Sequence, residues 1–275
     1  MDKQLALDHF RAIPEKILGE WRYRVFGAGD RAFLAIPGGE LVNDLGFEFA
    51  LAIAQTHSVI YPAYPRASSI GELSEGLRAV LDAEGIGQVA ILGASFGGAV
   101  AQVFVRRYPD RVRELILSNT GVPLGHLARP VGITYWIVKA MPWRLTSRLL
   151  RKPLLGTIDQ SGTDHAFWAD YLDELFASRL TKADVLSNIR VQYDYHRRFH
   201  FTPEDLKNWP GRVLIAESDS DVIGPRRRQA LRETYPCARV HTFHNAGHAP
   251  MFTRYGEYLE MVNSFLKQPD APTLH

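Results

Sequence analysis

The sequence has a single cysteine, Cys237, among 275 residues, and it has no long apolar run. One cysteine excludes an intrachain disulfide framework. No window approaches the roughly 20 apolar residues of a membrane-spanning helix. Residues 1–16 carry charges throughout and lack the apolar segment of a signal peptide. We therefore expect a soluble, cytoplasmic protein that has no membrane partner.

The chain also lacks a strong charge of either sign. Its 32 Lys and Arg residues and 30 Asp and Glu residues give a formal net charge of +2. A nucleic-acid-binding domain usually carries a dense basic patch or stripe. Nucleic acid is therefore not an expected partner, and a small molecule is the more plausible ligand class.

Short apolar runs alternate with helical patterns along most of the chain. Near-continuous apolar runs between helices are typical of a parallel sheet that is covered on both faces. The sequence thus predicts an α/β fold. Strands are predicted over residues 20–27, 32–39, 58–65, 88–95, 114–120, 212–218 and 238–245, and helices over residues 43–56, 69–84, 96–109, 225–235 and 255–267.

This alternation stops between residues 121 and 209. The segment has helical spacing, many aromatic residues and no strand-like run. A helical block between strands of one sheet is best explained as an insertion. We therefore predict a core formed by residues 1–120 and 210–275, with a helical cap formed by residues 121–209.

A serine flanked by glycines lies where the predicted strand 88–95 meets the next helix. The stretch "GASFG", residues 93–97, has the GxSxG pattern, in which the serine sits on a sharp strand-to-helix turn. A side chain at Gly93 or Gly97 would collide with the neighbouring strand or helix. The alternative is a phosphate-binding turn, but neither GxGxxG nor a Gly-Lys-Ser/Thr ending is present. Ser95 is therefore the candidate nucleophile.

A serine hydroxyl needs a general base, which a carboxylate orients in turn. In proteins with this elbow the acid and then the histidine follow the serine along the chain. His248, in "NAGHAP" after the last predicted strand, is the candidate base. Asp221 is the favoured acid. Asp219, after the preceding strand, and Glu217, at the end of that strand, remain alternatives.

The same region allows a metal-binding alternative. His244 and His248 are four residues apart, with His241 nearby. That spacing aligns two ligands on a helix, but this stretch is predicted to be strand and loop, with no obvious third ligand. We expect no metal and no cofactor.

Acyl transfer also needs backbone donors for the developing oxyanion. The N–H of Phe96, directly after the serine, is the first candidate donor. The second is the N–H of Gly39, in the loop "IPGGELVND" after the first parallel strand. Glu40 is the alternative donor in that loop.

The motifs "GASFGG", "SDSDVI" and "NAGHAP", in this order around a helical insertion, resemble the α/β-hydrolase superfamily over essentially the whole chain. The resemblance implies a mostly parallel, eight-stranded sheet with helices on both faces and a helical lid. It also implies Ser95 as nucleophile, Asp221 as acid and His248 as base. One departure is Pro37 in the oxyanion loop, where many members have a histidine. "YPAYP", "GASFGGAVAQVF" and "DRVRELILSNT" are also similar to maspardin-type proteins.

We interpret the chain as a serine hydrolase that cleaves an ester-like acyl bond in a small, apolar substrate. A serine at the elbow argues against dehalogenase or epoxide hydrolase chemistry, which requires a carboxylate nucleophile. A C–C bond hydrolase, an acyltransferase and a ligand- or partner-binding protein with little turnover remain alternatives. The oligomeric state is left open. Aromatic residues of the insertion are predicted to line the pocket: Tyr135, Trp136, Trp143, Phe167 and Trp168.

Overall fold

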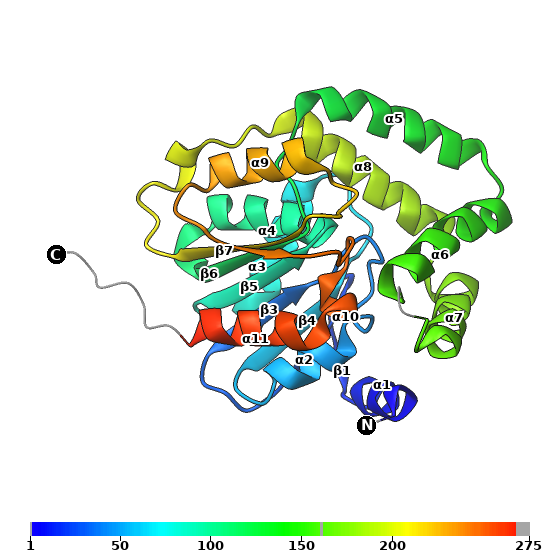
Figure 1. The fold of residues 1–275 in the computed structure, drawn as a ribbon, viewed down its shortest axis with the longest axis horizontal. Helices are drawn as coiled ribbons and strands as arrows, with labels where there is room; N and C mark the ends of the chain where they lie inside the picture. The colour runs from blue at the N-terminus through cyan, green and yellow to red at the C-terminus, as the bar shows by residue number, and fades with distance from the viewer. Residues whose placement is uncertain (1, 160–161, 268–275) are drawn as a thin grey trace.

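The computed structural model describes residues 2–159 and 162–267, and its centre is an eight-stranded sheet (Figure 1). The strand order is β1-β2-β4-β3-β5-β6-β7-β8. The two pairs that involve β2 are antiparallel, and the other five are parallel. The strands are β1 (Glu15–Leu18), β2 (Trp21–Phe26), β3 (Ala32–Ile36), β4 (Ser58–Ala63), β5 (Val89–Ala94), β6 (Val112–Ser118), β7 (Arg212–Ser218) and β8 (Arg239–Phe243). The predicted mostly parallel α/β sheet is confirmed.

Helices cover both faces of this sheet. On one face α2 (Phe47–Ile53) packs against α11 (Tyr255–Leu266), and on the other α3 (Ile70–Ala83) packs against α4 (Phe96–Arg107) (Figure 1). The central strands β3 and β5 are therefore buried along almost their whole length. This explains why they appear in the sequence as continuous apolar runs. The remaining short helices are η1 (Pro109–Arg111), η3 (Pro203–Leu206), α9 (Pro225–Thr234) and α10 (Pro250–Thr253).

Two elements at the N-terminus were missing from the prediction. Helix α1 (Lys3–Arg11) precedes the sheet, and the edge strand β1 forms a hairpin with β2. Three of the four residues of β1 are exposed and the fourth is half-buried. The strand therefore has no alternation of apolar and polar residues by which it could be recognised.

The chain between β6 and β7 is helical. It contains α5 (Gly125–Ala140), α6 (Trp143–Ile158), α7 (His165–Glu174), the π-helical turn η2 (Leu175–Arg179) and α8 (Lys182–Arg198). Helix α5 packs on α8 and α6 packs on α7, to one side of the sheet (Figure 1). Among the described residues, no helix has the length and apolar character needed to cross a bilayer.

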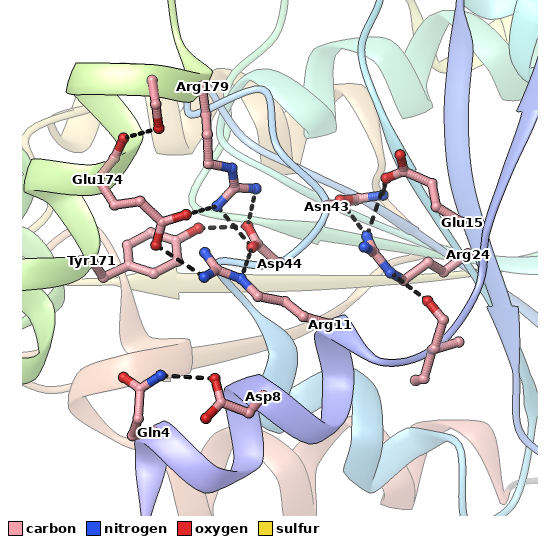
Figure 2. A network of polar contacts seen from close by, with 12 residues as sticks. Gln4, Asp8, Arg11, Glu15, Arg24, Asn43, Asp44, Tyr171, Glu174 and Arg179 are labelled. Atoms are coloured by element: carbon pink, nitrogen blue, oxygen red, sulfur yellow. Dashed lines mark hydrogen bonds and ion pairs between the residues drawn. The ribbon is translucent and has the colours of Figure 1, made fainter.

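A buried carboxylate joins this helical segment to the sheet domain and to α1. Asp44, in the loop before α2, is 1% exposed. Its carboxylate accepts hydrogen bonds from Arg11 Nε at 3.0 Å, Tyr171 Oη at 2.6 Å and Arg179 Nη2 at 2.9 Å (Figure 2). The three donors come from α1, α7 and η2. One side chain in the loop before α2 thus ties α1 to the continuous α7–η2 segment, which is distant in sequence from both.

These contacts change the protonation equilibrium of Asp44. Burial by itself would raise the pKa of the Asp44 carboxyl, but Arg179, Tyr171 and Arg11 together lower it below its usual value. A carboxyl whose pKa is lower in the folded state contributes stability above its unfolded pKa of about 3.9. That contribution is lost as the pH falls through the folded value.

We predict that Asp44→Asn lowers the free energy of unfolding by about 2–3 kcal/mol at pH 7, because Arg11 and Arg179 lose their buried carboxylate partner and keep only Glu174, whose side chain is 43% exposed. The loss is less than for a fully buried pair, since Arg11 and Arg179 are 27% and 26% exposed. The difference from wild type should shrink as the pH falls from about 5 towards 2. Urea unfolding at several pH values measures it.

Asp82→Asn is the matched control for this experiment. Asp82 also pairs with two arginines, but its side chain is 42% exposed. Exposed ion pairs contribute little, so the control should change stability by about 0.5 kcal/mol or less. Equal effects of the two substitutions, or a pH-independent effect of Asp44→Asn, would contradict this account.

Candidate active site

Ser95 lies on a sharp turn between β5 and α4, in an uncommon backbone conformation. Its φ is 51° and its ψ is −115°, a region that residues with a side chain rarely occupy. The turn is held by hydrogen bonds from Ser95 N to Ser118 O at 2.9 Å and from Thr120 Oγ1 to Ser95 O at 2.7 Å. This geometry is that of a nucleophile elbow.

Only glycine fits at the two positions that flank the serine, Gly93 and Gly97. A Cβ on Gly93 would lie 2.4 Å from Gly97 O, and a Cβ on Gly97 would lie 2.4 Å from Pro37 O. Both neighbours are backbone atoms, which cannot move aside as a flexible side chain can. The expected collisions are therefore confirmed, and they explain the lack of bulk around the serine.

The structure brings Ser95, His248 and Asp221 into one hydrogen-bonded chain. His248 Nε2 lies 2.9 Å from Ser95 Oγ, and His248 Nδ1 lies 2.7 Å from Asp221 Oδ1. Because an ionised carboxylate only accepts hydrogen bonds, Nδ1 carries the proton and Nε2 is free to accept one from the serine. The arrangement suits general-base activation of a hydroxyl nucleophile.

The two alternative acids lie in other pairings. Asp219 accepts from His244 Nδ1 at 2.8 Å, and Glu217 forms an ion pair with Arg232. Neither carboxylate is hydrogen-bonded to His248. Of the three acidic residues at the end of β7 and directly after it, only Asp221 extends the chain that begins at Ser95.

Asn119 is a member of this site that sequence reasoning missed. It follows β6 directly, and its Nδ2 donates to Asp221 Oδ2 at 2.7 Å, while Ile223 N donates to Asp221 Oδ1 at 2.9 Å. Its φ of 45° turns the chain there. The only available signal was its position at the carboxyl end of a central strand, the edge at which α/β sheets build their sites.

These donors hold Asp221 in its ionised form. Burial would raise the pKa of the Asp221 carboxyl, but the hydrogen bond and charge of His248, together with Ile223 N–H and Asn119, lower it below its usual value. The side chain is 1% exposed. An ionised, buried carboxylate fixes the orientation of the imidazole and stabilises its protonated form.

The histidines of the metal alternative do not converge. His241 Nε2 lies 2.9 Å from Glu257 Oε1, His244 contacts Asp219, and His248 contacts Asp221. In the part of the chain that the structure describes, no three His, Cys, Asp or Glu side chains gather around a common point.

Of the two backbone donors predicted for the oxyanion, Phe96 N–H directly follows Ser95 in the chain, and Gly39 lines the same cavity as Ser95. Phe96 is the first residue of α4, so its N–H is one of the donors that a helix N-terminus leaves without an intrahelical partner. In the loop after β3, the N–H of Gly38 donates to Glu40 Oε1 at 2.8 Å, and the N–H of Glu40 also faces this carboxylate. Within residues 2–159 and 162–267, neither Phe96 N–H nor Gly39 N–H has a hydrogen-bond acceptor.

Two side chains brace this loop, which lacks the histidine of many superfamily members. Tyr64 Oη donates to Pro37 O at 3.0 Å, and Glu40 holds Gly38 from the other side. Burial raises the pKa of the Glu40 carboxyl, and this outweighs the lowering effect of the two backbone N–H groups and of His248. From the sequence, only the backbone N–H of Glu40 is a candidate for this site. The role of its side chain could not be predicted, because no periodic pattern indicates where a loop side chain points.

Comparison with known proteins agrees with this geometry. The model of the "Alpha/beta hydrolase family" matches residues 20–261, which is most of the chain and includes all three residues of the hydrogen-bonded chain. The protein belongs to the α/β-hydrolase family. It is thus a hydrolase by family, as the resemblance in sequence motifs implied.

Three similar proteins show the range of this family. The chain is 26% identical over 236 residues to 2-hydroxymuconate semialdehyde hydrolase of Pseudomonas putida, covering 79% of this chain and 80% of that protein. It is 25% identical over 255 residues to maspardin of Danio rerio, covering 90% and 78%. The solved structure of MGS-M2, an α/β hydrolase from a deep-sea metagenome library, superposes with a TM-score of 0.75 at 20% identity, covering 95% of this chain and 100% of that chain.

A cavity of about 440 Å³ opens above Ser95 in this hydrolase. Its floor includes Ser95, His248 and the oxyanion loop, and its upper wall comes from α5, α6 and α8. Most of the lining side chains are apolar, among them Leu45, Phe49, Leu154, Ile158, Leu175 and Met251. Among the described residues, three ionisable side chains line the cavity: Glu40, Tyr61 and His248. None of the lining residues is a Lys or Arg.

The predicted pocket aromatics must be corrected. None of the five lines the cavity above Ser95: Tyr135, Trp136, Trp143, Phe167 and Trp168. Trp168 is 2% exposed and packs edge-on against Phe252, while Trp143 packs against Phe176. Tyr135 and Trp136 lie along a separate surface groove between α5 and α8. These rings pack helices together or face solvent. The cavity is lined by aliphatic residues and by other aromatic ones: Phe49, Tyr61, Phe176 and Phe252.

Proposed function

We propose that this hydrolase cleaves an ester-like acyl bond in an uncharged, apolar substrate through Ser95, His248 and Asp221. The observation that carries the proposal is the hydrogen-bonded chain at the floor of an apolar cavity, with contacts of 2.9 Å and 2.7 Å. A serine activated by histidine and carboxylate is the arrangement used for acyl transfer on several unrelated folds.

The mechanism has two halves. His248 Nε2 takes the hydroxyl proton as Ser95 Oγ bonds to the carbonyl carbon, and it then gives this proton to the leaving oxygen as the carbon–oxygen bond breaks. A water molecule attacks the acyl-enzyme and gives a proton to His248, which returns it to Ser95 as the acid leaves. The N–H groups of Phe96 and Gly39 stabilise the oxyanion in both halves.

We further propose that residues 121–209 act as a cap on a core formed by residues 1–120 and 210–275. The helices of this segment supply the upper wall of the cavity, and they keep bulk water away from the acyl-enzyme. Exclusion of water strengthens each hydrogen bond to the developing charge.

The charge of the cavity favours an uncharged acyl group. A carboxylate taken from water into an apolar site needs a cation or several donors as compensation. The cavity offers no Lys or Arg among the described residues, and its one carboxyl, Glu40, cannot act as a counter-charge. The pocket therefore suits an alkyl or aryl acyl chain.

A second candidate is hydrolysis of a carbon–carbon bond, which the same serine could begin by attacking a ketone. The similarity to 2-hydroxymuconate semialdehyde hydrolase favours it. The muconate of that name is a carboxylate, however, and the cavity here has no cation to bind one. This contrast makes the ester the first candidate.

The triad assignment is tested with p-nitrophenyl esters from acetate to decanoate. Ser95→Ala should lower kcat/KM by about 10³-fold or more, since the nucleophile is lost. Asp221→Asn should lower kcat by about 10³–10⁴-fold, because the imidazole loses its orientation and its charge partner.

Asp219→Asn is the matched control, since Asp219 lies in the same loop and contacts His244 instead. It should change kcat/KM less than about threefold. Equal kcat/KM for wild type and Ser95→Ala, or an equal loss of activity in Asp221→Asn and Asp219→Asn, would contradict the proposal. Either result would favour the ligand-binding alternative.

The charge preference is tested with two esters of equal chain length, p-nitrophenyl butyrate and the mono-p-nitrophenyl ester of succinate. At pH 8 the neutral ester should have a kcat/KM at least about 100-fold higher, a difference of about 2.7 kcal/mol in transition-state binding. Glu40→Gln, which can still accept from Gly38 N–H, should leave the preference for the neutral ester in place, because the missing cation disfavours the carboxylate whatever the charge of Glu40. Faster hydrolysis of the succinate ester would instead favour a carboxylate-bearing substrate and the carbon–carbon candidate.

A further inference from the structure

Helices α5 and α6 carry an unusual number of exposed apolar side chains. Among the described residues, six of the ten large apolar side chains that are exposed lie on these two helices: Ile133, Trp136, Ile137, Leu145, Leu149 and Leu150. Ile133, Trp136 and Ile137 have the i, i+3, i+4 spacing of one helix face. Trp136 is 65% exposed, a large fraction for a tryptophan.

The charged side chains of these two helices are all basic. Residues 115–158 contain no Asp or Glu but hold six basic residues: Arg129, Lys139, Arg144, Arg148, Arg151 and Lys152. Because these are six of the 32 basic residues, the rest of the chain has 26 basic against 30 acidic residues. Two consecutive helices of a nearly neutral protein thus carry positive charge with no acidic residue among it. We call these exposed apolar and basic side chains of α5 and α6 the α5–α6 patch.

Most of these cations are not used within the protein. Arg151 pairs with Asp173 at 2.5 Å, and Lys139 lies 4.7 Å above the Trp136 ring. In residues 2–159 and 162–267 no carboxylate pairs with Arg129, Arg144, Arg148 or Lys152. Many arginines elsewhere do have such partners, for example Arg11, Arg106 and Arg212. The patch therefore offers free positive charge beside exposed apolar groups.

The patch also adjoins the mouth of the active-site cavity. Thr134 and Val138 of α5, and Leu150 and Leu154 of α6, line that cavity. Thr134 and Leu150 are exposed, so the cavity reaches the surface between these helices. A surface that docks here would face the entrance to Ser95.

We propose that the α5–α6 patch docks this hydrolase on the surface of an anionic phospholipid bilayer. Helices with exposed Trp, Leu and Ile side chains beside Lys and Arg bind at such interfaces, where apolar groups enter the acyl boundary and cations meet the headgroups. Docking of this kind needs no spanning helix. It revises the expectation of no membrane partner, which rested on the absence of an apolar run in the sequence.

A second copy of the chain fits the patch less well. A symmetric dimer would place the same surface of each copy face to face. Each copy would bring the same group of cations with no carboxylate between them, and such like-charge contacts oppose association. Nucleic acid would satisfy the charges but leave the apolar side chains without a partner.

The test is co-sedimentation of the full-length protein with vesicles of phosphatidylcholine alone or with about 30% phosphatidylglycerol. Binding to the anionic vesicles should be at least tenfold tighter and should weaken in about 0.5 M salt. Arg144→Glu/Arg148→Glu and Trp136→Ser/Leu149→Ser should each weaken binding at least tenfold. Ser95→Ala should bind like wild type, because docking does not depend on catalysis.

Matched double variants elsewhere on the surface are the controls. Arg226→Glu/Arg239→Glu changes the charge equally, and Leu5→Ser/Ile17→Ser removes two apolar side chains that are 62% and 64% exposed. Both should bind like wild type, and thermal unfolding should show that all variants are folded.

Three results would overturn the proposal. The first is no preference for anionic vesicles. The second is that Trp136→Ser/Leu149→Ser binds as tightly as wild type, which would mean adsorption to any polyanion. The third is light scattering that shows a dimer in the absence of lipid, dissociated by the same patch variants, which would assign the surface to a second copy.

Discussion

The turn at Ser95 is the constraint on which the rest of the site depends. Its φ of 51° lifts the hydroxyl out of the sheet edge and starts α4 at the next residue, which leaves Phe96 N–H without a helical partner. This conformation persists because Gly93 and Gly97 allow strand, helix and oxyanion loop to approach within contact distance of backbone atoms. The positions of Ser95 and of the Phe96 N–H are therefore fixed by one packing arrangement, stabilised by the buried strands around it.

The remaining parts are supplied by loops at the same edge of the sheet. Asp221 follows β7, His248 follows β8, and Asn119 follows β6 and holds the carboxylate in place. Parallel strands bring these distant residues together, because all their carboxyl ends meet at one edge. Glu40 and Tyr64 replace a missing histidine in bracing the oxyanion loop. That loop places a carboxyl inside an otherwise apolar cavity.

Much of this could be predicted from local patterns. Glycine spacing marked Ser95, and apolar runs marked the buried strands, because both signals act within a few residues. Tertiary packing decided the rest. Trp168 has the same helical spacing whether it faces a cavity or Phe252, so the pocket prediction was wrong. The exposed strand β1 has no alternation of apolar and polar residues by which it could be predicted. Nothing in the chain around Asn119 indicates that its amide reaches Asp221, 102 residues away.

The central claim is that Ser95 is the activated nucleophile of this hydrolase. The most direct measurement is reaction with a fluorophosphonate followed by peptide mass spectrometry, because this reagent forms a stable bond only with a serine whose proton is removed by a base. We predict a single adduct on Ser95, formed much more slowly in His248→Ala and absent in Ser95→Ala. No adduct, or an adduct on another residue that persists in Ser95→Ala, would contradict the account.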